Sequence, residues 1–258
     1  MKSTILSEKD AKLIEKVILK YGRILHVRDL MKVFQDEYSK ASAHNRINQL
    51  ARAGWFRRLK QGLYLIIDSL TARSQIDVSL LSIANAFVNN SYVSLSHALN
   101  YYQLFDHYST TVVSIAMRES KKYLFDAYTF KYAKVKHDLY FGFTEKIING
   151  KKVRVAEAEK ALIDYLYLDK SFGSASLVFE KLRDNTRDLD CKKLQEYASR
   201  SGLTVARKIG FMLDRLKIDS TLLHRALLLE HRGASRFTND SKSFNAKWRL
   251  YYDDRIVG

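Results

Sequence analysis

Residues 39–67 constrain the fold more than any other stretch, because a helical pattern there passes directly into two strand patterns. Small and aliphatic residues recur at helical spacing and predict one narrow packing face, formed by Ala43, Ile47, Leu50, Ala51 and Gly54. Gly54 is expected to end the helix in the left-handed conformation. Residues 55–59 and 63–67 are predicted strands, joined by a turn in which Gly62 takes a positive φ.

The opposite face of this predicted helix is polar. At about 100° per residue, Ser42, Asn45, Gln49 and Arg52 point away from the packing face, flanked by Arg46 and Asn48. Residues 40–60 contain six Lys or Arg and no Asp or Glu. Amide, hydroxyl and guanidinium groups suit base edges in a major groove, and cations suit phosphates. We therefore predict base reading by Ser42, Asn45, Arg46 and Gln49, and phosphate binding by Lys40, Arg52, Arg57, Arg58 and Lys60. The alternative is a solvated helix and hairpin that are merely basic.

Two further helices are predicted before this stretch. Ser7 followed by Asp10 is a helix-start signal, and an apolar stripe continues from it to Gly22. A second helix is predicted over residues 27–34. Three helices and a hairpin in this order indicate a winged helix-turn-helix DNA-binding domain over residues 1–70. The polar residues 68–74 are its predicted boundary.

The charge of the chain points to a polyanionic partner. The 258 residues have a formal net charge of +16, and residues 1–68 hold 14 basic and 7 acidic residues. An apolar fraction of 47% allows a sizeable core, and the length favours two or three domains. We find neither an apolar run of membrane-spanning length nor a signal core, so a cytoplasmic location without membrane association is expected. A single cysteine leaves no internal disulfide and no cysteine-based metal cluster.

Residues 71–258 form the predicted carboxy-terminal domain, which is mixed α/β over 71–170 and mainly helical over 171–258. Helices are predicted over 77–88, 95–104, 155–166, 174–184, 189–201, 203–217 and 219–231. Strands are predicted over 92–94, 111–117, 128–133, 139–148 and 152–155, with a further strand near 248–252. The Asn149-Gly150 pair is a hairpin signal. The predicted fold class is therefore α+β.

Four segments together resemble the AbiEi family of antitoxins, and the resemblance covers nearly the whole chain. The first closes the winged unit as Arg58-Leu59-Lys60-Gln61-Gly62-Leu63-Tyr64. The others are Tyr92-Val93-Ser94-Leu95-Ser96-His97-Ala98-Leu99, the run from Val155 to Asp164, and Ala206-Arg207-Lys208-Ile209-Gly210-Phe211-Met212-Leu213. This chain departs from the family by having no proline near the middle strands.

The resemblance implies a repressor that is also an antitoxin. The winged domain would bind inverted repeats in double-stranded operator DNA upstream of its own operon. The carboxy-terminal part would counter an AbiEii nucleotidyltransferase toxin in a type IV toxin–antitoxin system of phage defence, in which direct contact between the two proteins is not required. We expect no enzymatic activity, no cofactor and no metal, and a monomer or weak dimer.

Other functions remain open from the residues alone. A metal-dependent nuclease targeted by the winged domain is one alternative, indicated by Glu157, Glu159, Lys160 and Asp164. However, these four side chains cannot all point to one site from a single helix. His97 and Cys191 are weaker catalytic candidates. A ligand-responsive transcriptional regulator is a further alternative.

A second basic surface is also predicted, from Arg118, Lys121, Lys122, Lys151, Lys152 and Arg154. It would extend the DNA footprint or meet a toxin bound to nucleic acid. Tyrosines around these residues could stack on single-stranded RNA, with core packing as the alternative.

Overall fold

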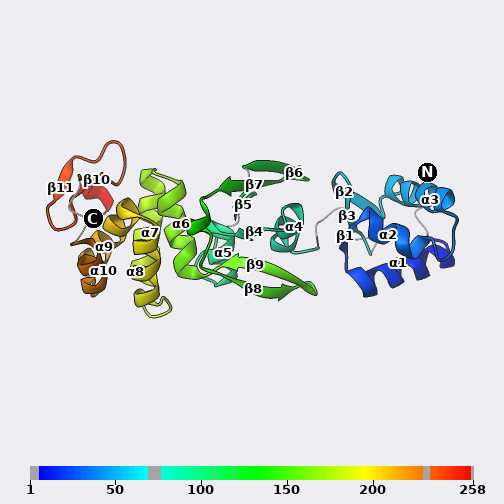
Figure 1. The fold of residues 1–258 in the computed structure, drawn as a ribbon, viewed down its shortest axis with the longest axis horizontal. Helices are drawn as coiled ribbons and strands as arrows, with labels where there is room; N and C mark the ends of the chain where they lie inside the picture. The colour runs from blue at the N-terminus through cyan, green and yellow to red at the C-terminus, as the bar shows by residue number, and fades with distance from the viewer. Residues whose placement is uncertain (1–5, 69–76, 108, 119, 229–232, 257–258) are drawn as a thin grey trace. The chain divides into compact units, whose positions relative to one another are not determined.

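The computed structural model describes residues 6–68, 77–107, 109–118, 120–228 and 233–256. The chain divides into two compact units. Figure 1 labels the helices and strands along the chain. The first unit comprises residues 1–89, 123–127 and 146–153, and the second comprises residues 90–122, 128–145 and 154–258. Both helices and strands occur in each unit, so the fold is mixed α/β.

The amino-terminal part of the first unit combines three helices with a small antiparallel sheet. The helices are α1 (Glu8–Tyr21), α2 (Val27–Phe34) and α3 (Lys40–Arg52). The strands are β1 (Ile24–His26), β2 (Phe56–Lys60) and β3 (Leu63–Ile66), in the order β1-β3-β2. The three predicted helices and the predicted hairpin are thus confirmed as elements.

Local sequence signals explain where these elements begin and turn. The Ser7 side chain accepts a hydrogen bond from the backbone N–H of Asp10 at 3.1 Å and caps α1. Ser39 caps α3 in the same way through the N–H of Ser42 at 3.3 Å. Gly54 and Gly62 have φ values of +88° and +73°, which most other residues adopt only at a cost in energy. The end of α3 and the turn of the β2–β3 hairpin are therefore determined by local sequence.

The core of this part lies between the three helices and the sheet. Leu30 and Phe34 of α2 are fully buried against Val17 of α1 and Ile47 of α3. The rings of Phe34 and Phe56 meet edge to face, with their centroids 6.1 Å apart. The apolar face of α3 is therefore packed in this core, and its polar face points outward.

Six strands form one mixed sheet in the order β6-β7-β5-β4-β9-β8. They are β4 (Ser91–Val93), β5 (Thr111–Ala116), β6 (Lys121–Phe125), β7 (Tyr128–Lys134), β8 (Phe143–Ile148) and β9 (Lys151–Ala156). β4 is antiparallel to β5 and parallel to β9, and β5 is parallel to β7. The helices around these strands are α4 (Leu80–Phe87), α5 (Leu95–Tyr101) and the short η2 (His137–Leu139).

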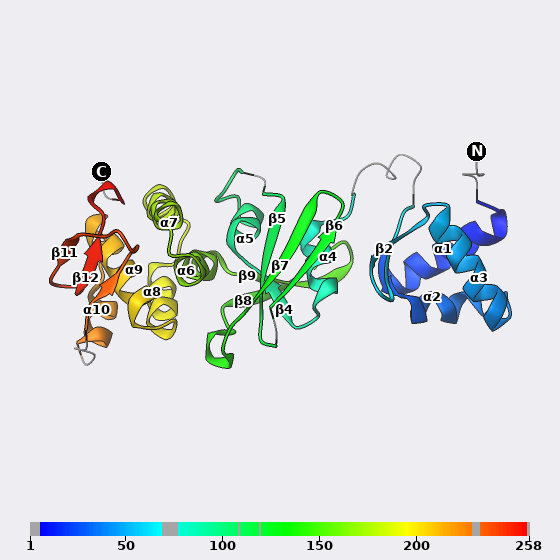
Figure 2. The same ribbon diagram turned by 90° about the horizontal axis from the view of Figure 1, so that it is seen from above.

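The rest of the second unit is mainly helical and ends in a small sheet (Figure 2). Its helices are α6 (Ala158–Leu168), α7 (Phe172–Asp184), α8 (Cys191–Arg200), α9 (Leu203–Arg215), α10 (Thr221–Leu227) and η3 (Asp254–Ile256). Its strands are β10 (Ser235–Arg236), β11 (Ser243–Asn245) and β12 (Leu250–Tyr252), in the order β10-β12-β11. α9 is the central helix, since residues 205–213 are all buried.

Several predicted bounds differ from the structure. The predicted strand 139–148 begins only at Phe143, because η2 and an irregular segment in which Gly142 has a φ of +70° precede it. The helix predicted over 219–231 is Thr221–Leu227, and residues 229–231 lie outside the described part, as do 69–74 of the predicted boundary. β1, β6, β10 and β11 were not predicted. β1, β10 and β11 are at most three residues long, too short to show a strand periodicity.

Candidate functional site

The outer face of α3 is exposed. Ser42, Asn45 and Gln49 are all exposed, whereas Ala43, Ile47 and Leu50 on the other side are buried. The structure therefore brings three of the four predicted base-reading side chains together on one accessible face of one helix.

Arg46, the fourth, is held by a buried carboxylate of α1. Its Nε donates to Asp10 Oδ1 at 2.9 Å, and its Nη2 donates to Asp10 Oδ2. The Asp10 side chain is 0% exposed and also accepts a hydrogen bond from the Ser7 hydroxyl. Arg46 thus links α3 to α1 through this ion pair. Its predicted role as a base reader would require the guanidinium to leave a buried partner.

Arg46 also orients its neighbour on the outer face. Its Nη1 donates to Gln49 Oε1 at 2.8 Å. Because a guanidinium only donates, the Gln49 amide oxygen must face Arg46, and its amide nitrogen points elsewhere. Gln49 therefore presents a donor edge set by the arginine.

The pKa of Asp10 reflects this arrangement. Burial opposes ionisation, but hydrogen bonds from Arg46 and Ser7 and the charge of Arg46 outweigh it, so the pKa lies below its usual value. The Asp10–Arg46 pair is accordingly ionised at neutral pH.

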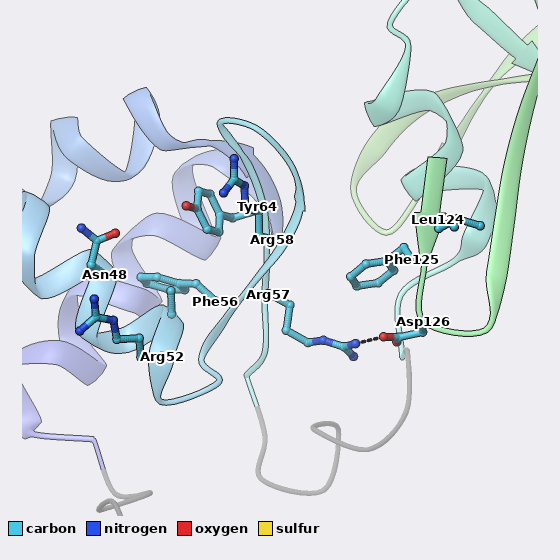
Figure 3. A pocket seen from close by; sticks show the side chains of 10 residues that line it. Asn48, Arg52, Phe56, Arg57, Arg58, Tyr64, Leu124, Phe125 and Asp126 are labelled. Carbon is cyan, nitrogen blue, oxygen red and sulfur yellow. Dashed lines mark hydrogen bonds and ion pairs between the residues drawn. The ribbon is translucent and has the colours of Figure 1, made fainter. Parts of the chain in front are cut away.

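The predicted phosphate-binding residues fall into two groups. Lys40, Arg52 and Arg58 are exposed. Arg57 is half-buried and pairs with Asp126 of the β6–β7 turn, as the dashed line in Figure 3 marks. The Lys60 ammonium donates to the backbone oxygen of Phe87. Three of the five cations are therefore directed to solvent.

An open pocket is lined by the end of α3, the β2–β3 hairpin and residues 124–126 at the end of β6 (Figure 3). Arginines predominate among its polar groups, and Asp126 is its one carboxylate. The lining consists of Asn48, Ala51, Arg52, Phe56, Arg57, Arg58, Tyr64, Leu124, Phe125 and Asp126. This chemistry suits an anion, with Asp126 as a competing negative charge at Arg57.

The predicted second basic surface is not continuous. Lys121 and Lys122 lie on β6 at one edge of the sheet, whereas Lys151, Lys152 and Arg154 lie on β9, with β7, β5 and β4 between. Lys151 is half-buried and donates to the backbone oxygen of Ile24, and burial lowers its pKa. Arg154 donates to Glu145 at 3.3 Å. Arg118, Lys121, Lys122 and Lys152 are exposed. The sequence could not reveal this separation, because strand order depends on non-local pairing.

The acidic residues considered for catalysis face two different parts of the fold. Asp164 is buried, pairs with Lys160 and accepts from the Ser94 hydroxyl at 2.7 Å. Glu159 accepts from the backbone N–H of Asp190 at 2.9 Å. Glu157 accepts from the Tyr197 hydroxyl. Glu157 and Glu159 thus contact α8 and its N-cap, whereas Asp164 contacts the segment before α5. Within the described ranges no three His, Cys, Asp or Glu side chains gather as metal ligands.

The surroundings of His97 and Cys191 shift the pKa of both side chains. His97 is 6% exposed, and burial lowers its pKa. Burial and nearby carboxylates raise the pKa of the Cys191 thiol, which disfavours the reactive thiolate. Burial therefore disfavours the charged form of both side chains.

Asp10 is the residue that the sequence interpretation missed. Its place after Ser7 predicts only a helix start. However, Asp10, Leu13, Ile14 and Val17 follow the buried spacing of α1. A carboxylate on a buried stripe requires a cationic partner, and this signal could have identified it.

Comparisons with known proteins bear on the fold alone. No family model matches the chain, and no curated protein does. Among solved structures, the crystal structure of the RV2827C protein from Mycobacterium tuberculosis is similar, with a TM-score of 0.64 and 13% sequence identity. The match covers 98% of this chain and 94% of that chain. None of the helices in the described residues has the length and apolar character needed to cross a bilayer.

Proposed function

We propose that this chain is a cytoplasmic, non-enzymatic repressor that binds duplex DNA through an amino-terminal winged helix-turn-helix. One observation carries the proposal: the exposed polar face of α3 leads into a cationic hairpin, and residues 40–60 contain no acidic residue. In this assignment α3 is the recognition helix and the β2–β3 hairpin is the wing.

The outer face of α3 has the chemistry for reading a major groove. Ser42, Asn45 and Gln49 offer hydroxyl and amide groups at the spacing of one helix face. Gln49, oriented by Arg46, offers its amide nitrogen, which favours a base with acceptors on its groove edge. We expect this position to prefer guanine, adenine or thymine over cytosine.

We further propose that the chain counters a nucleotidyltransferase toxin. This half rests on the resemblance to AbiEi antitoxins in the segments around Tyr92, Val155 and Ala206. A nucleotidyltransferase gene adjacent to this one, together with rescue of its toxicity by this chain in coexpression, would support it. Failure of rescue with intact DNA binding would leave a plain repressor.

Replacing Gln49 by alanine is expected to weaken binding to the preferred duplex by about 1–3 kcal/mol and to broaden base preference at one position. Duplexes selected from a random library with the wild-type chain supply the preferred site, and electrophoretic titration measures both affinities. Gln35→Ala is the matched control, because Gln35 is an exposed glutamine at the end of α2. Equal losses on selected and random duplexes would contradict base reading by Gln49.

Replacing Arg52 and Arg58 by alanine is expected to weaken binding to all duplexes alike. Each lost phosphate contact should reduce the slope of log K against log salt by about one unit. Titrations at several salt concentrations measure that slope. Arg187→Ala, at an exposed arginine of the second unit, is the control and should leave the slope unchanged. An unaltered slope in the double variant would refute phosphate binding by these residues.

A further inference from the structure

The small carboxy-terminal sheet has one face packed on α9 (Figure 2). The ring of Phe211 on α9 lies 5.7 Å from that of Phe237 and 4.6 Å from that of Tyr252, measured between centroids. Leu250 of β12 is fully buried. This face supplies the apolar contacts that hold the sheet in place.

The other face has a row of three side chains, one from each strand. Arg236 of β10 is paired in register with Tyr251 of β12, and Tyr251 is paired with Phe244 of β11. Directly opposed residues project from the same face of a sheet. The Arg236 guanidinium carbon lies 4.3 Å from the centroid of the Tyr251 ring, and the Phe244 ring lies 4.9 Å from it.

This row is unusual for the outer face of a sheet that has only one packed side. Such faces are normally polar. Phe244 is nevertheless 50% exposed, on an edge strand. One side of the ring meets Tyr251, so the remaining surface is available for a planar ligand.

We propose that the Arg236–Tyr251–Phe244 row binds single-stranded nucleic acid, with a base stacked on Phe244. Every base has a π-face, so aromatic rings on a sheet bind single strands with little sequence preference. An apolar protein partner fits less well, because the row contains no aliphatic side chain and ends in a cation. The inference does not rest on the proposed duplex binding.

The charges around the row suit a phosphate backbone. Arg236 Nη1 donates to the backbone oxygen of Ser241 at 2.7 Å, which fixes the guanidinium beside the tyrosine ring. Lys242 is exposed two residues before Phe244. Three acids among the described residues lie nearby: Asp253 pairs with Arg255 at 2.6 Å, Asp254 accepts from the Ser243 hydroxyl at 2.6 Å, and Asp240 is exposed.

Fluorescence anisotropy of the full chain with labelled oligothymidylate and oligouridylate, about 12 nucleotides long, tests this proposal. Phe244→Ala is expected to bind about tenfold more weakly at fixed salt, with an unchanged salt slope, because stacking is removed and no charge is lost. Arg236→Ala should lower the slope. Phe244→Trp should retain affinity, and its indole emission should be quenched on binding.

Leu222→Ala is the matched control, because Leu222 is an apolar side chain of the same unit that is 45% exposed. It should bind as the wild type does. Affinity of Phe244→Ala within about twofold of wild type on both oligonucleotides would overturn the proposal and leave the row to a protein partner. An equal loss on duplex and single strands would also overturn it, since only single strands expose base faces for stacking.

Discussion

Replacing Arg46 by alanine is expected to lower the free energy of unfolding of the first unit by about 3–5 kcal/mol. The variant leaves the Asp10 carboxylate, 0% exposed, without its cationic partner. This loss exceeds the 1–3 kcal/mol expected for a base contact. The structure thus changes the prediction for Arg46 from relaxed base preference to lost stability.

The effect should depend on pH. In the wild type the lowered pKa of Asp10 means that its ionised form contributes stability above the unfolded pKa, and this contribution is lost as pH falls through the folded pKa. Without Arg46, the effect of burial on Asp10 is no longer offset by a cation, so the pKa of Asp10 is higher than in the wild type. The difference in stability between variant and wild type should therefore shrink as pH falls.

Urea denaturation, monitored by fluorine NMR of a chain labelled with fluorotryptophan, can assign this loss of stability to one unit. Trp55 lies in the first unit and Trp248 in the second, and these are the two tryptophans of the chain. Arg46→Ala should shift the Trp55 transition. Arg52→Ala, at an exposed arginine of the same helix, should change stability by about 0.5 kcal/mol or less. A variant at Arg46 that unfolds like the wild type but loses duplex preference would restore the base-reading role.

Replacing Gly210 by alanine is expected to lower the free energy of unfolding of the second unit by about 3 kcal/mol. A Cβ at this position of α9 would lie less than 3.0 Å from ring carbons of Trp248. The indole is 1% exposed, and its Nε1 donates to Asp214 at 2.8 Å, so it has little room to move. Better helix propensity would return about 1 kcal/mol at most, which is less than the steric cost.

In this variant the Trp248 signal should show the shift, while the Trp55 signal should not. Gly173→Ala on α7 is the matched control, because the nearest atom to a Cβ there is 3.9 Å away. This substitution should be neutral or slightly stabilising. If Gly210→Ala were as stable as Gly173→Ala, the packing of Trp248 against α9 would be wrong.

Local signals predicted the elements, and long-range pairing limited what could be predicted about the site. The spacing of Ala43, Ile47 and Leu50 was sufficient to place α3 and its exposed face. The same spacing could not show that Arg46 turns toward α1, because its partner lies 36 residues earlier. Likewise, the sequence predicted that Lys121 and Lys151 belong to one basic surface, but the strand order places three strands between them.

The buried acids of α6 illustrate the same limit. The run from Glu157 to Asp164 resembles a cluster of catalytic carboxylates in sequence. In the structure Glu157 and Glu159 face α8, whereas Asp164 faces away from it and pairs with Lys160 one turn earlier. A short pattern of charged residues does not say whether the side chains meet, and only the helix geometry and the neighbours decide it.

In the order β1-β3-β2, β2 is an outer strand of its sheet, and an outer strand is where a second chain could extend a sheet. Arg57, Arg58 and Lys60 lie on this strand. Positive charges on such a strand repel a second copy that would otherwise extend the sheet. Neutralising all three would therefore be expected to promote self-association through strand pairing, and studies of the wing would have to monitor particle size alongside affinity.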